Sequence, residues 1–533
     1  MKAGLRFAAA SACAVLALRP TLAAPPEGAD ADTRDWWSTT ALLADDRMEG
    51  RDTGSAGYAR AAAYVVERFK TAGLEPAGDH GGWPQAVPLT EVEVGSEGTS
   101  VKVVRNPSTV RFEFLHEITV RATSALPSEL DAPLAFRGYC SGAELGTDMK
   151  GRIAVCFGTR RHGLPNAAER IRAAAEAGAV GIISVDDPGF TLEPARWPAA
   201  YARAVRIAGD PPVATPRLAV FNLSSAGFVK LLAGTGLNAA AVLEAGAAKQ
   251  ALPGFDIPGR FSAHLAVSQR NYSSDNVLAL LPGTDPRLKD EVLVVSAHLD
   301  GYGYGAPVGG DTLYNGAFDD AAYVATLIRL ADRRHARGFR RSVLFAVFTG
   351  EEKGLLGSKW FVRHPTVARS RLVADINLDM LRPLFPLKAL TMLAMTDSSL
   401  AASARSVGKP MRIEIRPDRE PERGLLERAD HWSFLQAGIP ATTFVFAYDP
   451  NTEAERRYRE WYNVRYHRPQ DDMGQPIDLA AATAFNRFFY ALTEAVADAQ
   501  ARPVLRHGGG GGAAESPTTP ADASSRPATP GRD

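Results

Sequence analysis

The apolar positions of the chain follow two different spacings, which predict strands and helices in alternation. Strand-like apolar runs occur at VLAL, EVLVVSAHLD, SVLFAVFTG, RLVADINLDM and ATTFVFAYD, between residues 277 and 449. The segment DDAAYVATLIRLADRRHA carries apolar residues at helical spacing instead, among them Val324, Leu327, Ile328 and Ala331. This order predicts an α/β fold with a mixed, mostly parallel central sheet and helices on both faces.

Two regions that precede residue 255 have other patterns. Residues 32–78 have a helical apolar stripe, and Gly73 is placed where a helix would end. Residues 91–254 contain short strand-like runs such as VKVVR, RIAVCFG and VGIISV, together with the helical segment NAAERIRAAAEAGA. We therefore predict that residues 25–90 and 255–502 form the main domain and that residues 91–254 are a β-rich α+β insertion.

Both ends of the chain are predicted to lie outside the folded domains. Residues 1–24 resemble a signal peptide, because Lys2 and Arg6 precede an apolar run that ends near the small residues Ala23 and Ala24. This pattern predicts export to the periplasm or the extracellular space. Residues 503–533 are rich in glycine, serine, threonine, proline and alanine, and this composition predicts a disordered tail.

The cysteines permit two interpretations. Cys13 lies in the apolar run of the signal peptide and would leave with it, so that Cys140 and Cys156 remain. In an oxidising compartment these two residues could form a disulfide. Two buried free thiols fit the sequence equally well.

The charge balance argues against two classes of partner. The chain has 60 basic and 60 acidic residues and a pI near 7.2, so it lacks the basic field that attracts nucleic acid or anionic lipid. No segment after the signal peptide is apolar for long enough to cross a bilayer, and stable membrane insertion is not expected. The composition does not indicate an oligomeric state.

Acidic residues and histidines follow the predicted strands one after another. They are His298 and Asp300, Asp319 and Asp320, Glu351 and Glu352, Asp379, and much later His467. Taken singly, each has an ordinary explanation, such as a helix cap or a solvated helix start. Taken together, they would meet at the carboxyl ends of the strands, where α/β sheets bind their ligands. A set of imidazoles and carboxylates without thiolates is typical of a site for two borderline metal ions.

The motifs AHLD, NGAFDD, TGEEKGLLGS, NLDM and YHRPQDD, in this order, resemble the signature of the co-catalytic di-zinc exopeptidases, a family that includes secreted bacterial aminopeptidases. The resemblance covers residues 32–503 and implies the zinc exopeptidase fold. Within residues 91–254, the segments MKGRIAVCFG and RAAAEAGAVGIISVDD resemble a protease-associated domain, which is a known insertion in this family.

The resemblance implies two zinc ions per chain and assigns their ligands. One ion would be held by His298, Asp319 and Asp379, and the other by Asp319, Glu352 and His467. Asp319 would therefore bridge the ions, and its peptide bond to Asp320 would be cis. Asp300 would not bind metal but would orient His298 by accepting its second ring N–H.

The resemblance also implies the catalytic groups. Glu351 would act as the general base towards a water activated between the two ions. Tyr466 matches a tyrosine that donates to the oxyanion in some members of the family. Phe318 and the segment 321–323 differ from the residues usual in the family, which affects the expected pocket shape and no ligand position.

Four other histidines are less favoured as site residues. His431 lies in ERADHWSFLQAGIPATTF, which also resembles the family, and a supporting or core role is favoured over metal binding. His335 and His364 are expected on the surface, and His507 falls in the predicted tail.

The leading functional hypothesis is a secreted zinc aminopeptidase that acts on peptides. A carboxypeptidase or a dipeptidase could use the same metals with a different group for the peptide terminus. A glutaminyl cyclase is less favoured, because those relatives work with one zinc ion. A peptidase-like binding protein without catalysis is disfavoured by the complete ligand set. The residue preference is open.

Overall fold

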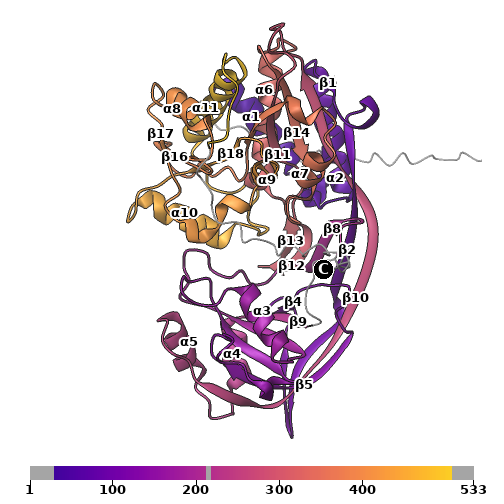
Figure 1. Ribbon diagram of the computed structural model, residues 1–533, viewed down its shortest axis with the longest axis vertical. Coiled ribbons are helices and arrows are strands. Elements are labelled where there is room, and N and C mark those ends of the chain that lie inside the picture. The colour runs from indigo at the N-terminus through magenta and orange to yellow at the C-terminus, as the bar shows by residue number, and fades with distance from the viewer. Residues whose placement is uncertain (1–28, 212–217, 507–533) are drawn as a thin grey trace, which may run out of the picture.

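The computed structural model describes residues 29–211 and 218–506. Its ribbon has two lobes, joined by the long strands β2 and β10 (Figure 1). The predicted signal peptide, Cys13, His507 and most of the predicted tail lie outside the described residues. Residues 503–506 are described, and Leu505 forms a β-bridge with Ser398 of the main domain.

Helices and strands alternate most regularly between residues 322 and 442. The helices are α1 (Ala31–Leu43), α2 (Ala56–Thr71), α3 (Ala167–Glu176), α4 (Ser225–Leu232), α5 (Ala239–Ala247), α6 (Ala322–Arg334), α7 (Leu356–Arg363), α8 (Leu400–Gly408), α9 (His431–Gln436), α10 (Glu453–Val464) and α11 (Leu479–Ala497). The strands up to residue 281 are β1 (Glu75–Pro76), β2 (Pro84–Arg105), β3 (Ser108–Phe112), β4 (Ile118–Val120), β5 (Glu129–Arg137), β6 (Ile153–Gly158), β7 (Gly181–Asp186), β8 (Ala202–Ile207), β9 (Ala219–Leu223) and β10 (Gly254–Leu281). The later strands are β11 (Val292–His298), β12 (Gly303–Val308), β13 (Asp311–Tyr314), β14 (Ser342–Phe348), β15 (Leu372–Asn377), β16 (Ala389–Met392), β17 (Glu414–Arg416), β18 (Ala441–Thr442) and β19 (Phe444–Phe446).

A single mixed sheet runs through both lobes. In the first lobe its order is β18-β15-β11-β14-β10, in which β10 is antiparallel to β14 and the other neighbours are parallel. Successive residues of a strand face opposite sides of the sheet. Leu293 and Val295 therefore pack with α1, α2, α6 and α11, whereas Val292 and Val294 pack with α7 and α9. The predicted α/β sheet with helices on both faces is confirmed.

The second lobe contains most of the residues predicted to form an insertion. Its strands β5, β6, β7 and β9 are parallel neighbours, and β10 pairs with β5 at this end and with β14 at the other. One core packs the sheet against α4 and α5, and a smaller core on the opposite face includes Ala174 of α3. Because β2 and β10 are 22 and 28 residues long, the two lobes share continuous strands.

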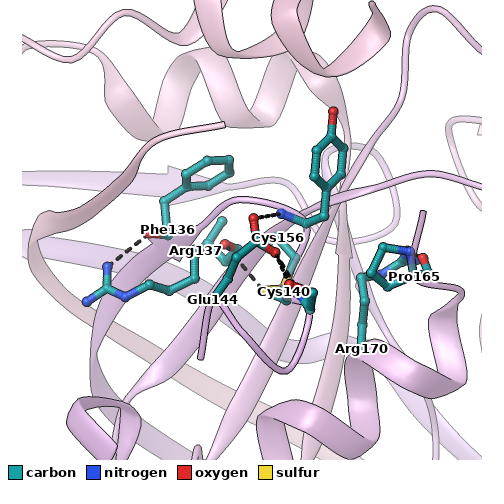
Figure 2. Close-up of a disulfide and its surroundings, with 10 residues drawn as sticks. Phe136, Arg137, Cys140, Glu144, Cys156, Pro165 and Arg170 are labelled. Atoms are coloured by element: carbon teal, nitrogen blue, oxygen red, sulfur yellow. Dashed lines mark hydrogen bonds between the residues drawn. A yellow bond between two sulfur atoms is a disulfide. The ribbon is translucent and has the colours of Figure 1, made fainter. Parts of the chain in front are cut away.

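Cys140 and Cys156 form a disulfide in the second lobe (Figure 2). The bond joins the loop after β5 to strand β6, on the same face as α3. Beside it, the Glu144 carboxylate accepts hydrogen bonds from the backbone N–H and the hydroxyl of Ser141 at 2.8 and 2.7 Å. The structure thus contains the paired alternative of the two that the sequence left open.

One predicted strand is divided in the structure. The run ATTFVFAYD was expected to form a single strand, but Ala441–Thr442 joins the main sheet as β18 and Phe444–Phe446 pairs with β16 in a small separate sheet. The strand prediction was wrong here because an apolar run does not reveal where the chain changes its pairing partner.

None of the helices within residues 29–211 and 218–506 is both long enough and apolar enough to span a membrane.

Candidate active site

The predicted site residues meet at the carboxyl ends of three parallel strands. β11 lies between β14 and β15, and its last residue, His298, is paired with Phe348 at the end of β14. Glu351 and Glu352 follow β14 across a short turn, and Asp379 follows β15. Parallel neighbours end at the same edge of a sheet, so residues distant in sequence become adjacent.

Asp319 lies between the two predicted histidine ligands. It belongs to the helical turn η4 (Ala317–Ala321), and its peptide bond to Asp320 is cis, as the resemblance implied. Its Oδ1 is 3.2 Å from Nε2 of His298, and its Oδ2 is 3.2 Å from Nε2 of His467. The Oε2 of Glu352 is 3.3 Å from the same nitrogen of His467.

The donor atoms form two adjacent groups. In each group the donor atoms lie within 4.8 Å of one another; the groups are His298, Glu351 and Asp379, and Asp319, Glu352 and His467. The second group is the ligand set that the resemblance assigns to one ion. The first group contains Glu351 in addition to His298 and Asp379. Asp319 belongs to the second group and contacts the first through His298.

The site concentrates buried carboxylates. Burial raises the pKa of Glu351 well above its usual range, and the nearby charges of Asp379 and Glu352 add to the effect. Burial also raises the pKa of Glu352, and it raises that of Asp379 to about 6. Burial opposes ionisation of Asp319 as well, but the neighbouring His298 and His467 side chains lower its pKa below the usual range.

These groups fit a pair of divalent cations. The Oδ2 atom of Asp319 is buried and has no hydrogen-bond partner among the described residues, although such atoms are normally satisfied. Burial lowers the pKa of His467 to about 3, so its ring is neutral and can offer a lone pair. Cations bound between the two groups would stabilise the ionised carboxylates and satisfy the unpaired oxygen.

A comparison with known protein families covers the segment that contains these residues. Residues 276–493 match the profile of peptidase family M28, and they include every residue of the site. This stretch is a peptidase family M28 domain. No curated protein sequence matches the chain significantly.

Solved structures show the same fold. An aminopeptidase from Aneurinibacillus sp. strain AM-1 is 20% identical, with a TM-score of 0.59, and the match covers 87% of this chain and 93% of that one. A zinc aminopeptidase from Bacillus subtilis is 17% identical, with a TM-score of 0.54 and coverage of 88% and 96%. A peptidase M28 precursor from Shewanella amazonensis is 16% identical, with a TM-score of 0.51 and coverage of 89% and 99%.

Asp300 of the M28 domain differs in detail from the expectation. Its carboxylate was expected to accept the second ring N–H of His298, but the nearest acceptor to Nδ1 is the Asp300 backbone carbonyl, at 3.0 Å, and the carboxylate is 3.7 Å away. The carboxylate instead accepts the backbone N–H groups of Glu351 and Glu352 and the hydroxyl of Thr53. It therefore holds the turn that carries both glutamates.

Two supporting residues of the M28 domain were not identified from the sequence. The Tyr302 hydroxyl is 2.7 Å from Nδ1 of His467, which fixes the orientation of that ring. The Asp471 carboxylate accepts the backbone N–H groups of Phe318 and Asp319 at 2.9 and 3.0 Å. Tyr302 lies two residues after the motif AHLD and Asp471 lies within YHRPQDD, yet neither spacing indicated a partner.

The family departures lie in the core and not in the site. Phe318 is fully buried and stacks near Trp461, with ring centroids 6.3 Å apart, and Tyr323 packs against Phe485. None of these residues lines the cavity beside the donor groups. His431 is also fully buried, and burial lowers its pKa to about 3, which fits the predicted core role. His335 and His364 are exposed, as expected.

A cavity of about 250 Å³ opens beside the donor groups. Besides the site residues, its lining includes Tyr302, Met380, Glu427, Arg428 and Tyr466. The Tyr466 ring lies against the His467 ring at a tilt, with centroids 3.6 Å apart, and its hydroxyl accepts a hydrogen bond from Arg428 at 3.0 Å. A peptide end that entered this cavity would reach both donor groups.

Proposed function

We propose that this protein is a zinc-dependent aminopeptidase that hydrolyses the N-terminal peptide bond of peptides. Support comes from the M28 domain and from the donor groups at the strand ends. Two zinc ions would be held by the residues that the resemblance assigns, namely His298, Asp319 and Asp379 for one and Asp319, Glu352 and His467 for the other. When bound, the ions would activate a water for attack and polarise the scissile carbonyl.

The side chains of the chain itself supply the proton transfers. Glu351 takes the proton of the attacking water and passes it to the leaving amine. Its carboxylate lies in the donor group of His298, with Oε2 3.9 Å from Nε2, beside the residues that would hold the ions. Tyr466 lines the cavity next to His467 and donates its hydroxyl hydrogen to the developing oxyanion.

The charge of the cavity favours an amino terminus over a carboxyl terminus. Arg428 is the one lysine or arginine among the described residues that line the cavity, and its guanidinium is already engaged by Glu193, Tyr462 and Tyr466. Glu427 also lines the cavity and is exposed, and it forms no ion pair with another described residue. A free carboxylate beside a neutralised guanidinium suits an α-ammonium group, and this observation carries the choice of aminopeptidase.

A panel of peptides tests the proposal. Zinc-loaded protein would be incubated with one peptide in three forms: both ends free, the amino end acetylated, and the carboxyl end amidated. We expect cleavage of the free and amidated forms, no cleavage of the acetylated form, and about two zinc ions per chain by elemental analysis. Cleavage that requires a free carboxyl end would support a carboxypeptidase instead. Protein that binds no zinc and cleaves no peptide would refute the proposal that this protein is a zinc-dependent enzyme.

We further propose that the protein is exported and that residues 91–254 are a protease-associated domain. The Cys140–Cys156 disulfide supports export, because such bonds persist in oxidising compartments. Fractionation of cells that express the full chain tests this, and protein retained in the reducing cytoplasm would contradict it. The assignment of residues 91–254 as a protease-associated domain is supported by the parallel strands β5, β6, β7 and β9 and their flanking helices.

A further inference from the structure

The second lobe contributes a buried acidic residue next to the catalytic cavity. Glu193 follows β7, and its side chain is only 4% exposed. It is surrounded by residues of the main domain: Arg428 and Tyr462 donate hydrogen bonds to its Oε1, the latter at 2.7 Å, and Arg423 lies 3.6 Å from its Oε2. Burial opposes ionisation, but Arg428 and the Tyr462 hydroxyl lower the pKa of Glu193 to about 2, so it is charged.

The neighbouring segment of the second lobe packs on the same wall of the site. The guanidinium of Arg196 lies 4.2 Å from the ring centroid of Tyr466. Arg468, which follows the predicted ligand His467, donates hydrogen bonds to the backbone carbonyls of Trp197 and Pro198 at 2.9 and 2.7 Å. Contacts to Glu193 are therefore part of an interface between the lobes that reaches the site residues.

A short chain of hydrogen bonds leads from Glu193 to Tyr466. The Nη1 atom of Arg428 donates to Glu193, and its Nη2 atom donates to two hydroxyls, that of Tyr466 at 3.0 Å and that of Tyr462 at 3.2 Å. A guanidinium can only donate, so the Tyr466 oxygen accepts this bond and its own hydrogen must point elsewhere. Tyr466 is one of the residues that line the cavity, so a substrate bound there would offer that hydrogen an acceptor.

We infer that Glu193 is a positioning residue of the active site: by holding Arg428, it directs the Tyr466 hydroxyl hydrogen towards the substrate carbonyl. The inference rests on the proposed function and adds a part for the second lobe. In the absence of the Glu193 charge, Arg428 would be free to turn towards solvent or towards Glu427, and Tyr466 would lose the partner that sets its hydrogen-bond direction. Binding of substrate in the cavity does not need this arrangement, but stabilisation of the oxyanion does.

A double-mutant cycle separates positioning from a general structural role. Loss of a single oxyanion donor lowers kcat by about 10²-fold, which is the expectation for Tyr466→Phe. Glu193→Gln keeps the size of the side chain and is expected to lower kcat by about tenfold with KM little changed, because one charge-assisted bond is weakened. In the Tyr466→Phe background, Glu193→Gln should have almost no further effect, since there is no hydroxyl left to direct.

The controls address folding and the metal site. Glu176→Gln removes the charge of an exposed glutamate at the end of α3 in the same lobe and should leave kcat unchanged. Zinc content and thermal midpoint of Glu193→Gln are measured alongside, so that a loss of activity from unfolding or lost metal is recognised. All kcat and KM values are measured with the peptide that the wild-type protein cleaves fastest among the free, acetylated and amidated forms.

The outcomes distinguish this inference from the proposed function. Non-additive effects on kcat, with zinc content retained, support the positioning role. An active wild-type protein in which Glu193→Gln has no effect, or in which its effect multiplies with that of Tyr466→Phe, overturns the inference alone. A wild-type protein that binds zinc and cleaves no peptide overturns the proposed function, and the inference falls with it.

Discussion

Removal of one hydroxyl group tests how the predicted metal site is supported. In Tyr302→Phe the ring remains, and with it the packing against His467 and Tyr201 at centroid distances of 4.5 and 5.3 Å. Only the 2.7 Å hydrogen bond to Nδ1 of His467 is lost. The ring of His467 would then be free to rotate, although no atom of a donor group has changed.

The size of the effect follows from that single bond. A neutral hydrogen bond contributes about 1 kcal/mol, and loss of a partner that orients a metal ligand lowers metal affinity by about 10- to 100-fold. The bond is short, but water can reach part of Tyr302 and of His467, because both residues are only partly buried. We therefore expect the low end of the range, a loss of about tenfold, or about 1.4 kcal/mol. Only the ion held by Asp319, Glu352 and His467 should be affected.

Competition with a chromophoric chelator measures the affinity of each ion. Zinc would be titrated into metal-free wild-type protein and Tyr302→Phe at one pH, and two binding steps would be fitted. Tyr304→Phe is the matched control, because Tyr304 is two residues away and 60% exposed. One weakened step in Tyr302→Phe and none in the control is the expected result. Two unchanged steps would refute the orienting role, and two equally weakened steps would point to a general loss of structure.

Three further predictions concern the base, a buried carboxyl and the disulfide. Glu351→Gln should retain zinc and lose about 10²- to 10⁴-fold in kcat; full turnover measured at normal zinc content would contradict the base assignment. Burial raises the pKa of Asp186 to about 6, against an opposing hydrogen bond from the Trp197 indole. The folded state therefore binds more protons than the unfolded state between about pH 4 and 6, and the free energy of unfolding should fall by up to about 1.4 kcal/mol per pH unit as the pH rises. Urea denaturation of the wild type and of Asp186→Asn checks this, and equal slopes in the two proteins would exclude it. Cys140→Ser combined with Cys156→Ser opens a link across 16 residues and should cost about 3 kcal/mol, measured by calorimetry against the oxidised wild type; an unchanged midpoint would show that the link adds no stability.

The main sheet and the donor residues of the site were predictable from the sequence because both depend on local patterns. Strands with apolar residues at almost every position are buried on two faces and read as continuous runs, as in β11 and β14. Polar residues at the ends of such runs cannot belong to the core, so His298, Glu351 and Asp379 stand out. The parallel topology then brings these ends to one edge of the sheet.

Other features depended on pairings between distant segments. The division of ATTFVFAYD between two sheets, the acceptor of the His298 ring and the choice of disulfide over thiols each depend on which residues lie opposite in space. A run of apolar or polar letters does not contain that information.

The chain by itself therefore established the α/β class, the order of the motifs and the chemical identity of the donor groups, because these follow from side-chain chemistry and from the periodicity of strands and helices. The tertiary structure decided what holds those groups in place. Tyr302 reaches His467 across 165 positions, and Glu193 reaches Arg428 from the other lobe. The second contact forms only when the long strands β2 and β10 have placed the two lobes together. Both hydrogen bonds depend on distance and angle in space and leave no periodic trace in the sequence.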